Sequence, residues 1–187
     1  MKNLAGESHF LGIGDMVFGQ APASIVTVLG SCVAITMYDP KQQLGAICHA
    51  ALPKCLDQQC HSSYCKPGKH VACAVRVMLR QFARHSICRQ DIQVKIFGGA
   101  DMFAKQVNKP PLFAIGSMND EAALRVLQQE GLTIEAMDTG GVSRRKVTFD
   151  MSTGRVMVEK ARGLRPRNSI RENVTPPSSL YMPTHEH

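Results

Sequence analysis

Two apolar runs separated by a short polar turn constrain the fold of this chain more than any other feature. Within 25–52, Val33, Ile35 and Met37 alternate with other residues in the first run, and the second run spans 44–52. Between them stands Asp39-Pro40, a dipeptide that favours a turn. The pattern predicts strands joined as an antiparallel hairpin, and a slip of one residue in its register would exchange the faces of all side chains.

Further along the chain the apolar spacing changes from strand-like to helical. Over 70–85 it predicts an amphipathic helix, on the residues Val71, Val75, Met78, Leu79 and Phe82. Over 92–98 apolar residues alternate again and predict a strand that ends at Gly98-Gly99. A second helix is expected over 119–131, with Asn119 as its N-cap and Gly131 at its C-terminal end.

Three short strands are expected near the end of the folded region, over 133–137, 145–149 and 155–159. The last two are separated by a Met-Ser-Thr-Gly turn and predict a second hairpin. The order of strands and helices favours an α/β (α+β) layered sandwich with mixed β-sheets flanked by helices. The chain of 187 residues suits one domain, expected over 1–162, followed by a disordered basic tail over 163–187.

Charge and hydropathy disfavour nucleic-acid-binding and membrane-inserted classes of protein. The formal net charge is +7, but five Lys and Arg fall after residue 159, so the body is only mildly basic. With no Trp, few aromatic residues and no dense basic run, a nucleic-acid partner is not expected. The sequence contains neither a secretory signal nor an apolar run of about 18 residues. A cytoplasmic protein without membrane insertion is therefore expected.

The seven cysteines lie between residues 32 and 88, and an odd number of reduced cysteines disfavours a disulfide scaffold. Four soft metal ligands fall in the polar loop 54–69, namely Cys55, Cys60, His61 and Cys65. Their spacing differs from the usual zinc motifs, in which paired ligands lie close together. Ordinary loop cysteines are favoured there, with metal binding and a reversible disulfide as alternatives, and no metal or organic cofactor is expected.

Cys32 and His49 are the pair that could carry chemistry. A cysteine is a strong nucleophile as a thiolate, which a neighbouring imidazole can generate, and the predicted hairpin could bring the two residues together. Gly30 and Ser31 precede the cysteine where backbone N–H groups could bind an oxyanion. Thr27 is the candidate to orient the histidine. The competing interpretation is a small buried cysteine beside a core histidine.

Two further features have alternative interpretations. Cys48 adjoins His49 and is a rival nucleophile, although neighbouring strand residues point to opposite faces. Arg76, Arg80 and Arg84 recur four residues apart. This arginine stripe is more typical of a solvated helix face than of a docking surface for acidic partners.

Several blocks in fixed order resemble the CheD family of chemoreceptor glutamine deamidases. They are IVTVLGSCVA (25–34), GAICHAALP (45–53), KIFGGADMF (95–103), IGSMN (115–119), DTGG (138–141) and RKV (145–147). The resemblance covers about residues 10–160. Several ordered blocks together are far more specific than any one of them.

The resemblance implies a layered α/β sandwich similar to the deamidase domain of necrotizing toxins. It also implies a catalytic Cys-His-Thr arrangement, placed by motif position at Cys32, His49 and Thr27. Gly98 and Gly99, otherwise plain turn formers, would line the substrate groove with Gly30 and Ser31. The implied reaction converts Gln to Glu on the cytoplasmic domains of methyl-accepting chemotaxis receptors through a thioester.

The resemblance also implies a CheC-type phosphatase as a partner. The alternative function is a non-enzymatic regulatory module that docks to such a phosphatase or to the receptor. A metal- or redox-responsive regulator is a third hypothesis, and it depends on the cysteine-rich loop alone.

Overall fold

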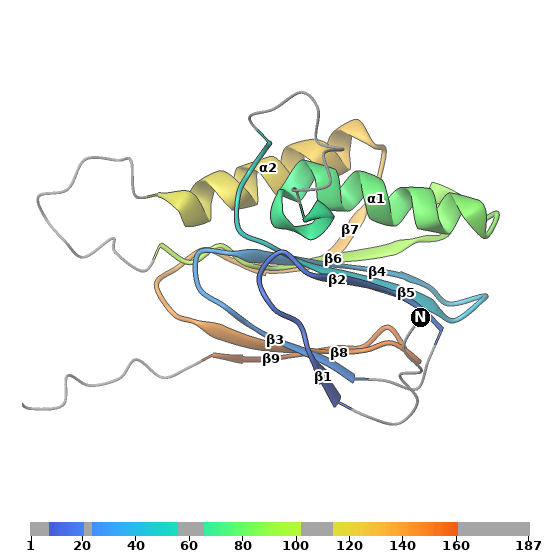
Figure 1. Ribbon diagram of the computed structural model, residues 1–187, viewed down its shortest axis with the longest axis horizontal. Coiled ribbons are helices and arrows are strands. Elements are labelled where there is room, and N and C mark those ends of the chain that lie inside the picture. The colour runs from blue at the N-terminus through green and yellow to red at the C-terminus, as the bar shows by residue number, and fades with distance from the viewer. Residues whose placement is uncertain (1–7, 21–23, 56–65, 102–113, 161–187) are drawn as a thin grey trace, which may run out of the picture.

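The computed structural model describes residues 8–20, 24–55, 66–101 and 114–160, which form three layers (Figure 1). The outer layer consists of helices α1 (Val71–Arg84) and α2 (Ile115–Gln129). The middle layer is a five-stranded sheet in the order β2 (Met16–Gly19), β5 (Leu44–Ala50), β4 (Val33–Asp39), β6 (Gln93–Gly98) and β7 (Ile134–Thr139). The third layer is a four-stranded sheet in the order β1 (Ser8–Phe10), β3 (Ser24–Leu29), β8 (Arg145–Asp150) and β9 (Val156–Lys160).

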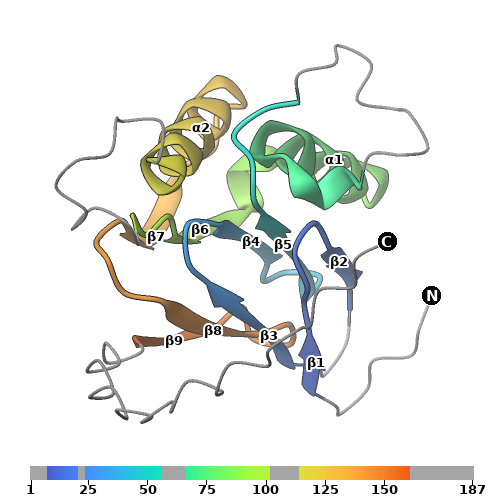
Figure 2. The same cartoon turned by 60° about the vertical axis from the view of Figure 1, so that its left-hand side comes forward.

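Both sheets mix parallel and antiparallel pairs, because β1 runs parallel to β3 and β6 runs parallel to β7. Both helices cover the same face of the five-stranded sheet, and the four-stranded sheet covers its other face (Figure 2). Short 3₁₀ turns at Pro67–Lys69 and Arg89–Asp91 connect α1 to its neighbours. The expected layered α+β sandwich with mixed sheets is confirmed, while the likeness to the toxin deamidase domain stays a prediction.

The predicted central hairpin is confirmed as β4 and β5, and its register is now fixed. Ala34 lies opposite His49, and Asp39 lies opposite Leu44. In the turn, the Gln42 backbone N–H donates to Asp39 Oδ2 at 2.8 Å. Every residue of both strands is buried, because one face packs on the helices and the other on the second sheet.

Helix α1, strand β6, the three late strands and the β8–β9 hairpin also lie where the sequence predicts them. Helix α2 begins at Ile115, so the prediction that Asn119 is its N-cap is wrong. Asn119 lies instead in the second turn, fully buried, where its side chain donates to the carbonyls of Ser31 and Ala51 rather than to the helix start. The helix ends near the predicted position, with Gly131 in the left-handed region at φ +69°.

Strands β1 and β2 are not anticipated by the sequence analysis. They are three and four residues long and half-buried or exposed, so they show little apolar alternation. Backbone pairing positions both strands at sheet edges, since β1 pairs with β3 and β2 pairs with β5. The segment between them becomes important at the site described below.

Two apolar cores fill the spaces between the three layers. The larger one lies between the helices and the five-stranded sheet, and includes Met78, Phe82 and Ile96. The smaller one lies between the two sheets, and includes Ile25, Ile47 and Phe149. No helix in the described ranges is long and apolar enough to cross a membrane. The expected tail at 163–187 lies outside the described residues.

Candidate active site

Three loops that are far apart in the sequence meet at one edge of the two sheets. The first is 30–32, between β3 and β4, and the second is 98–101, at the end of β6. The Gly99 N–H donates to the Cys32 carbonyl at 2.9 Å, and the Ala100 N–H donates to the Gly30 carbonyl at 2.8 Å. The third loop, 139–141, joins the second through the Gly140 N–H and the Gly98 carbonyl at 2.9 Å. Glycine-rich blocks of the sequence thus surround Cys32.

Thr27 and His49 come from different sheets and meet between them. Thr27 Oγ1 lies 2.8 Å from His49 Nδ1, and both residues are buried, at 0% and 3% exposure. Thr27 Oγ1 also donates to the Leu11 carbonyl oxygen at 2.8 Å. That carbonyl lies 3.4 Å from His49 Nδ1. The expected pairing of Thr27 with His49 is therefore present in the structure.

These contacts assign the tautomer of His49. Thr27 has one hydroxyl proton, which it gives to the Leu11 carbonyl, so its oxygen accepts from the imidazole. The carbonyl can only accept, which also requires a proton on Nδ1. Nε2 then carries the free lone pair of the neutral ring. That atom is buried and has no hydrogen-bond partner within the described part of the chain.

An unpaired buried nitrogen costs about 1–3 kcal/mol in a folded protein. For a histidine that serves only in packing, this loss of stability is not offset. A general base, in contrast, needs an unoccupied nitrogen. Burial lowers the pKa of His49, an effect that the Leu11 carbonyl and the Asp15 charge partly oppose. The imidazole is thus held neutral, in the form that can accept a proton.

Cys32 lies on the same side of the sheet as His49. It precedes Ala34 by two residues, Ala34 is the cross-strand partner of His49, and alternate strand residues share a face. Consistent with this, the half-buried Cys32 packs against the core between the sheets. Burial raises the pKa of the Cys32 thiol, and its own backbone N–H partly offsets that effect. At neutral pH, Cys32 is therefore a neutral thiol and His49 a neutral imidazole.

Cys48 occupies the opposite face, as strand geometry predicts. It is fully buried in the core beneath the helices, on the far side of β5 from the His49 ring. Burial raises the pKa of this thiol to about 12. Cys48 is therefore an inert packing residue and not a rival nucleophile.

Gly98 and Gly99 are in the loop cluster, where both have positive φ. A Cβ atom at Gly98 would lie 2.2 Å from the Cys32 carbonyl oxygen, and one at Gly99 would lie 1.8 Å from Asp120 Oδ1. Glycine is thus required at both positions for the loops to pack around Cys32. Whether they also line a substrate groove stays a prediction.

The sequence analysis missed three groups at this site. The Leu11 carbonyl could not be found from side-chain chemistry, because any residue supplies a carbonyl. Asn119 is fully buried beside the Cys32 loop and was assigned instead to a helix cap. Asp120 lies behind Gly99, and burial raises the pKa of its carboxyl group to about 6, against hydrogen bonds from Thr139 and Gly140. The IGSMN block (115–119) contains Asn119, but the family resemblance assigned no role to that residue.

The alternative of a metal site in the cysteine-rich loop falls largely outside the described residues. Cys55 is described and is a free thiol, whereas Cys60, His61 and Cys65 lie outside the described residues. In the described ranges no three His, Cys, Asp or Glu side chains gather as a metal site would require.

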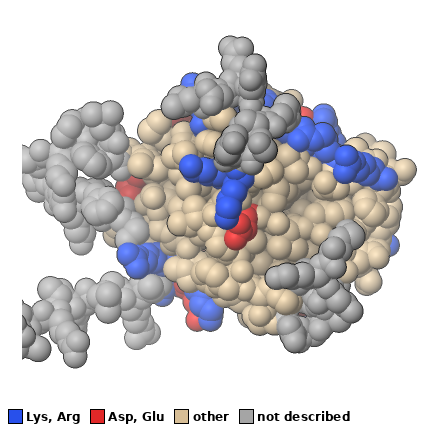
Figure 3. All heavy atoms as spheres, in the orientation of Figure 1, with Lys and Arg blue, Asp and Glu red and all other residues tan. Residues whose placement is uncertain are grey.

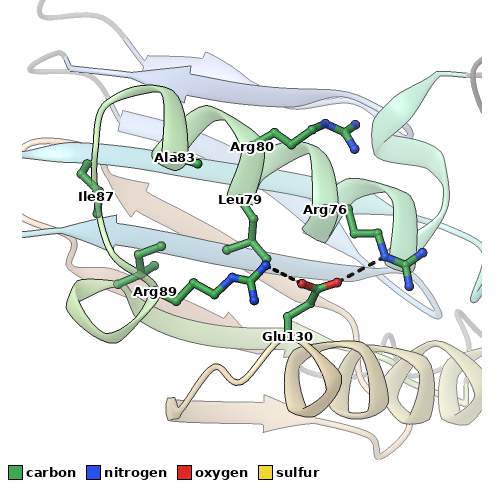
Figure 4. Close-up of a pocket in the computed structure, with 8 residues that line it drawn as sticks. Arg76, Leu79, Arg80, Ala83, Ile87, Arg89 and Glu130 are labelled. Carbon is green, nitrogen blue, oxygen red and sulfur yellow. Dashed lines mark hydrogen bonds and ion pairs between the residues drawn. The ribbon is translucent and has the colours of Figure 1, made fainter.

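The arginine stripe of α1 borders a cleft of about 250 Å³ with an apolar floor. Figure 4 shows Arg76 and Arg89 pointing at Glu130, while Arg80 points away from it. The Glu130 carboxylate lies 3.3 Å from Arg76 Nε and 2.9 Å from Arg89 Nη2. On the molecular face in Figure 3, Lys and Arg occur in separate groups. Part of the stripe is thus neutralised internally, which fits the solvated-face interpretation.

Comparison with known proteins identifies the family. A family model described as CheD chemotactic sensory transduction matches residues 51–160. This chain belongs to the CheD family. The "Probable chemoreceptor glutamine deamidase CheD 2" of Geobacter sulfurreducens is 36% identical over 151 residues, covering 81% of this chain and 88% of that protein. The "Probable chemoreceptor glutamine deamidase CheD" of Pseudomonas syringae is 34% identical over 149 residues, covering 80% of this chain and 86% of that protein.

A CheD protein of Methanococcus vannielii is 36% identical over 148 residues, covering 79% of this chain and 92% of that protein. Among solved structures, the hypothetical protein YfiH of Bacillus licheniformis superimposes with a TM-score of 0.38 at 10% identity. That superposition covers 68% of this chain and 51% of YfiH, and it is too distant to bear on fold or function.

Proposed function

We propose that this protein is a cysteine-dependent protein-glutamine deamidase that acts on the cytoplasmic domains of chemoreceptors. The single observation that carries the proposal is His49, which contacts Thr27 and lies on the face that Cys32 shares, with its buried Nε2 atom unpaired among the described residues. The names of the CheD relatives supply the substrate class. The thiol of Cys32, the imidazole of His49 and the hydroxyl of Thr27 support the proposed roles of nucleophile, base and orienting group.

The backbone of the Cys32 loop supports a site for the oxyanion. The carbonyls of Gly30 and Cys32 accept from backbone N–H groups, and the Ser31 carbonyl accepts from Asn119, so all three point into the protein. In a trans peptide the N–H group points opposite to the preceding carbonyl. The N–H groups of Ser31 and Cys32 therefore point outward, and neither donates to a backbone carbonyl of the described residues.

The reaction follows from these placements. As the Cys32 sulfur forms a bond to the carbonyl carbon of a glutamine side chain, its proton moves to His49 Nε2. The outward N–H groups stabilise the negative charge on the substrate oxygen. His49 then gives its proton to the nitrogen, the C–N bond breaks, and ammonia leaves a thioester on Cys32.

Hydrolysis of the thioester uses the same groups in reverse. His49 Nε2 takes a proton from water as the hydroxyl oxygen bonds to the carbonyl carbon. The C–S bond then breaks, the sulfur regains a proton from His49, and the side chain is released as glutamate. The residues described account for each proton in this sequence, since one water is consumed and one ammonia is released.

The test is conversion of glutamine to glutamate in a receptor cytoplasmic fragment, mapped by peptide mass spectrometry. The wild type is expected to convert specific glutamines, and Cys32→Ala is expected to convert none above background. Conversion by Cys32→Ala would overturn the nucleophile assignment. Absence of conversion by a folded wild type would instead favour the non-enzymatic module, which would be tested next by pull-down with a CheC-type phosphatase.

A further inference from the structure

Asn119 connects the two segments that carry the proposed nucleophile and base. Its Nδ2 group donates to the Ser31 carbonyl at 2.9 Å and to the Ala51 carbonyl at 3.1 Å. Ser31 adjoins Cys32, and Ala51 lies two residues beyond His49. Both acceptors are carbonyl oxygens, so the amide orientation is fixed, because the reverse orientation would place oxygen against oxygen.

The position of α2 makes this contact possible. Asn119 is fully buried, in the second turn of the helix. One turn earlier, Gly116 lies against the backbone of Gly99 and Ala100, where a Cβ atom would come within 2.8 Å of the Ala100 carbonyl. The close approach of the glycine brings the helix near enough for a side chain of this length to reach Ser31.

Among the described residues, a side chain holds the middle one of the three carbonyls in the Cys32 loop, and backbone groups hold the other two. Backbone N–H groups hold the Gly30 and Cys32 carbonyls, whereas Asn119 holds the Ser31 carbonyl. Because a peptide is planar, its carbonyl and the following N–H rotate as one unit. Fixing the Ser31 carbonyl therefore fixes the direction of the Cys32 N–H, which is the proposed oxyanion donor.

We propose that Asn119 is a positioning residue that orients the Ser31–Cys32 peptide so that the Cys32 N–H faces the reacting oxygen. This role rests on the proposed deamidase function. Asn119 itself does not touch the substrate in this account. Loss of its amide group frees the peptide to rotate, and the developing negative charge loses a donor that was in place before the reaction.

The first test compares two reactions of Cys32 in Asn119→Ala. Deamidation develops an oxyanion, whereas alkylation by iodoacetamide does not. The kcat for deamidation is expected to fall about 100-fold, the typical loss for one oxyanion donor, with KM changed less than about threefold. The alkylation rate of Cys32 is expected to stay within about threefold of the wild-type rate. Gln128→Ala, an exposed amide on the same helix, is the matched control.

Two further variants separate hydrogen bonding from packing and from folding. Asn119→Asp keeps the side-chain size but has no donor when ionised, so it is expected to lose at least as much kcat as Asn119→Ala. If Asn119→Ala fails to fold, Asn119→Leu replaces it, because leucine has a similar size and no donor. An unchanged kcat in the folded variants would overturn the positioning role. An equal loss of alkylation and deamidation would also overturn it.

A second readout does not depend on activity. In ¹⁵N-labelled protein the Cys32 amide resonance is expected to shift in Asn119→Ala and to stay in place in Gln128→Ala. An unmoved Cys32 resonance in Asn119→Ala would overturn the positioning role, even with an active wild type. Absence of deamidation by the wild type, in contrast, would overturn the proposed function and leave the resonance test to decide the role of Asn119 in the loop.

Discussion

The two faces of the five-stranded sheet provide opposite environments for neighbouring residues of β5. On the helix face, Cys48 is surrounded by aliphatic side chains and its thiol pKa rises to about 12. On the other face, His49 contacts a threonine hydroxyl and a backbone carbonyl through Nδ1, and its Nε2 has no partner among the residues that the structure describes. Both faces stabilise the fold through apolar burial, and the second face also holds the contact of His49 with Thr27. The contrast teaches that reactivity here depends on which face a side chain occupies.

The reactivities of the two face-specific cysteines should differ the most. In native protein at pH 8, iodoacetamide is expected to alkylate Cys32 at least about 100-fold faster than Cys48, because a thiol with a higher pKa and full burial forms almost no accessible thiolate. Peptide mass spectrometry over time measures both rates. Exposed Cys88 serves as the reference thiol. Equal rates in native protein would contradict the assignment, whereas equal rates in urea are expected.

Gly98→Ala should cause the next largest effect, because it crowds the Cys32 loop at the end of β6. The added Cβ atom meets the Cys32 carbonyl at 2.2 Å, and φ of +112° is unfavourable for alanine. Strain and overpacking together should lower the free energy of unfolding by about 3 kcal/mol. Urea denaturation measures this loss.

The matched control for Gly98→Ala is Gly131→Ala, at the end of α2. Its φ is also positive, but a Cβ atom there meets nothing within 4 Å. Only the backbone term applies, so a loss of about 1–2 kcal/mol is expected. Equal losses in the two variants would show that crowding against the Cys32 loop contributes nothing.

Thr27→Val should weaken the orientation of His49 while keeping the side-chain shape at position 27 almost unchanged. The hydroxyl that bridges His49 Nδ1 and the Leu11 carbonyl is lost, so the imidazole is less firmly oriented. A fall in deamidation kcat of about 10- to 50-fold is expected, less than the range for complete loss of a general base. Thr27→Ser keeps the hydroxyl and should retain most of the activity. A fully active Thr27→Val would refute the orienting role.

The smallest expected effect is a shift in the pH dependence of kcat/KM for deamidation. Burial lowers the pKa of His49, so the imidazole stays neutral to a lower pH than in the unfolded chain. The acid limb of kcat/KM is therefore expected below the usual histidine value of about 6.5. The free energy of unfolding should depend on pH in the same direction. The stability that His49 contributes is complete above a pH of about 6.5 and is lost as the pH falls below it. An acid limb above pH 7 would contradict this assignment.

Much of the fold could be predicted from local patterns. Alternating apolar residues predicted β4 and β6, a continuous apolar run predicted β5, and helical spacing predicted α1, because burial in the core leaves a record in the residue pattern. The short strands β1 and β2 leave no such record. Asn119 was misassigned because a buried asparagine and a helix cap have the same local signature. Only the approach of Gly116 to Gly99 distinguishes them.

The sequence by itself determined the candidate chemistry, since Cys32, His49 and Thr27 can be named from residue type and from blocks that resemble the CheD family. Strand alternation also assigned Cys48 to the face opposite His49. Tertiary structure alone decided that Thr27 contacts His49, that the Leu11 carbonyl fixes the tautomer, and that Asn119 holds the Cys32 loop. The physical reason is that these contacts join separate sheets, a short strand and a helix. Local periodicity carries no information about which distant segments pack together.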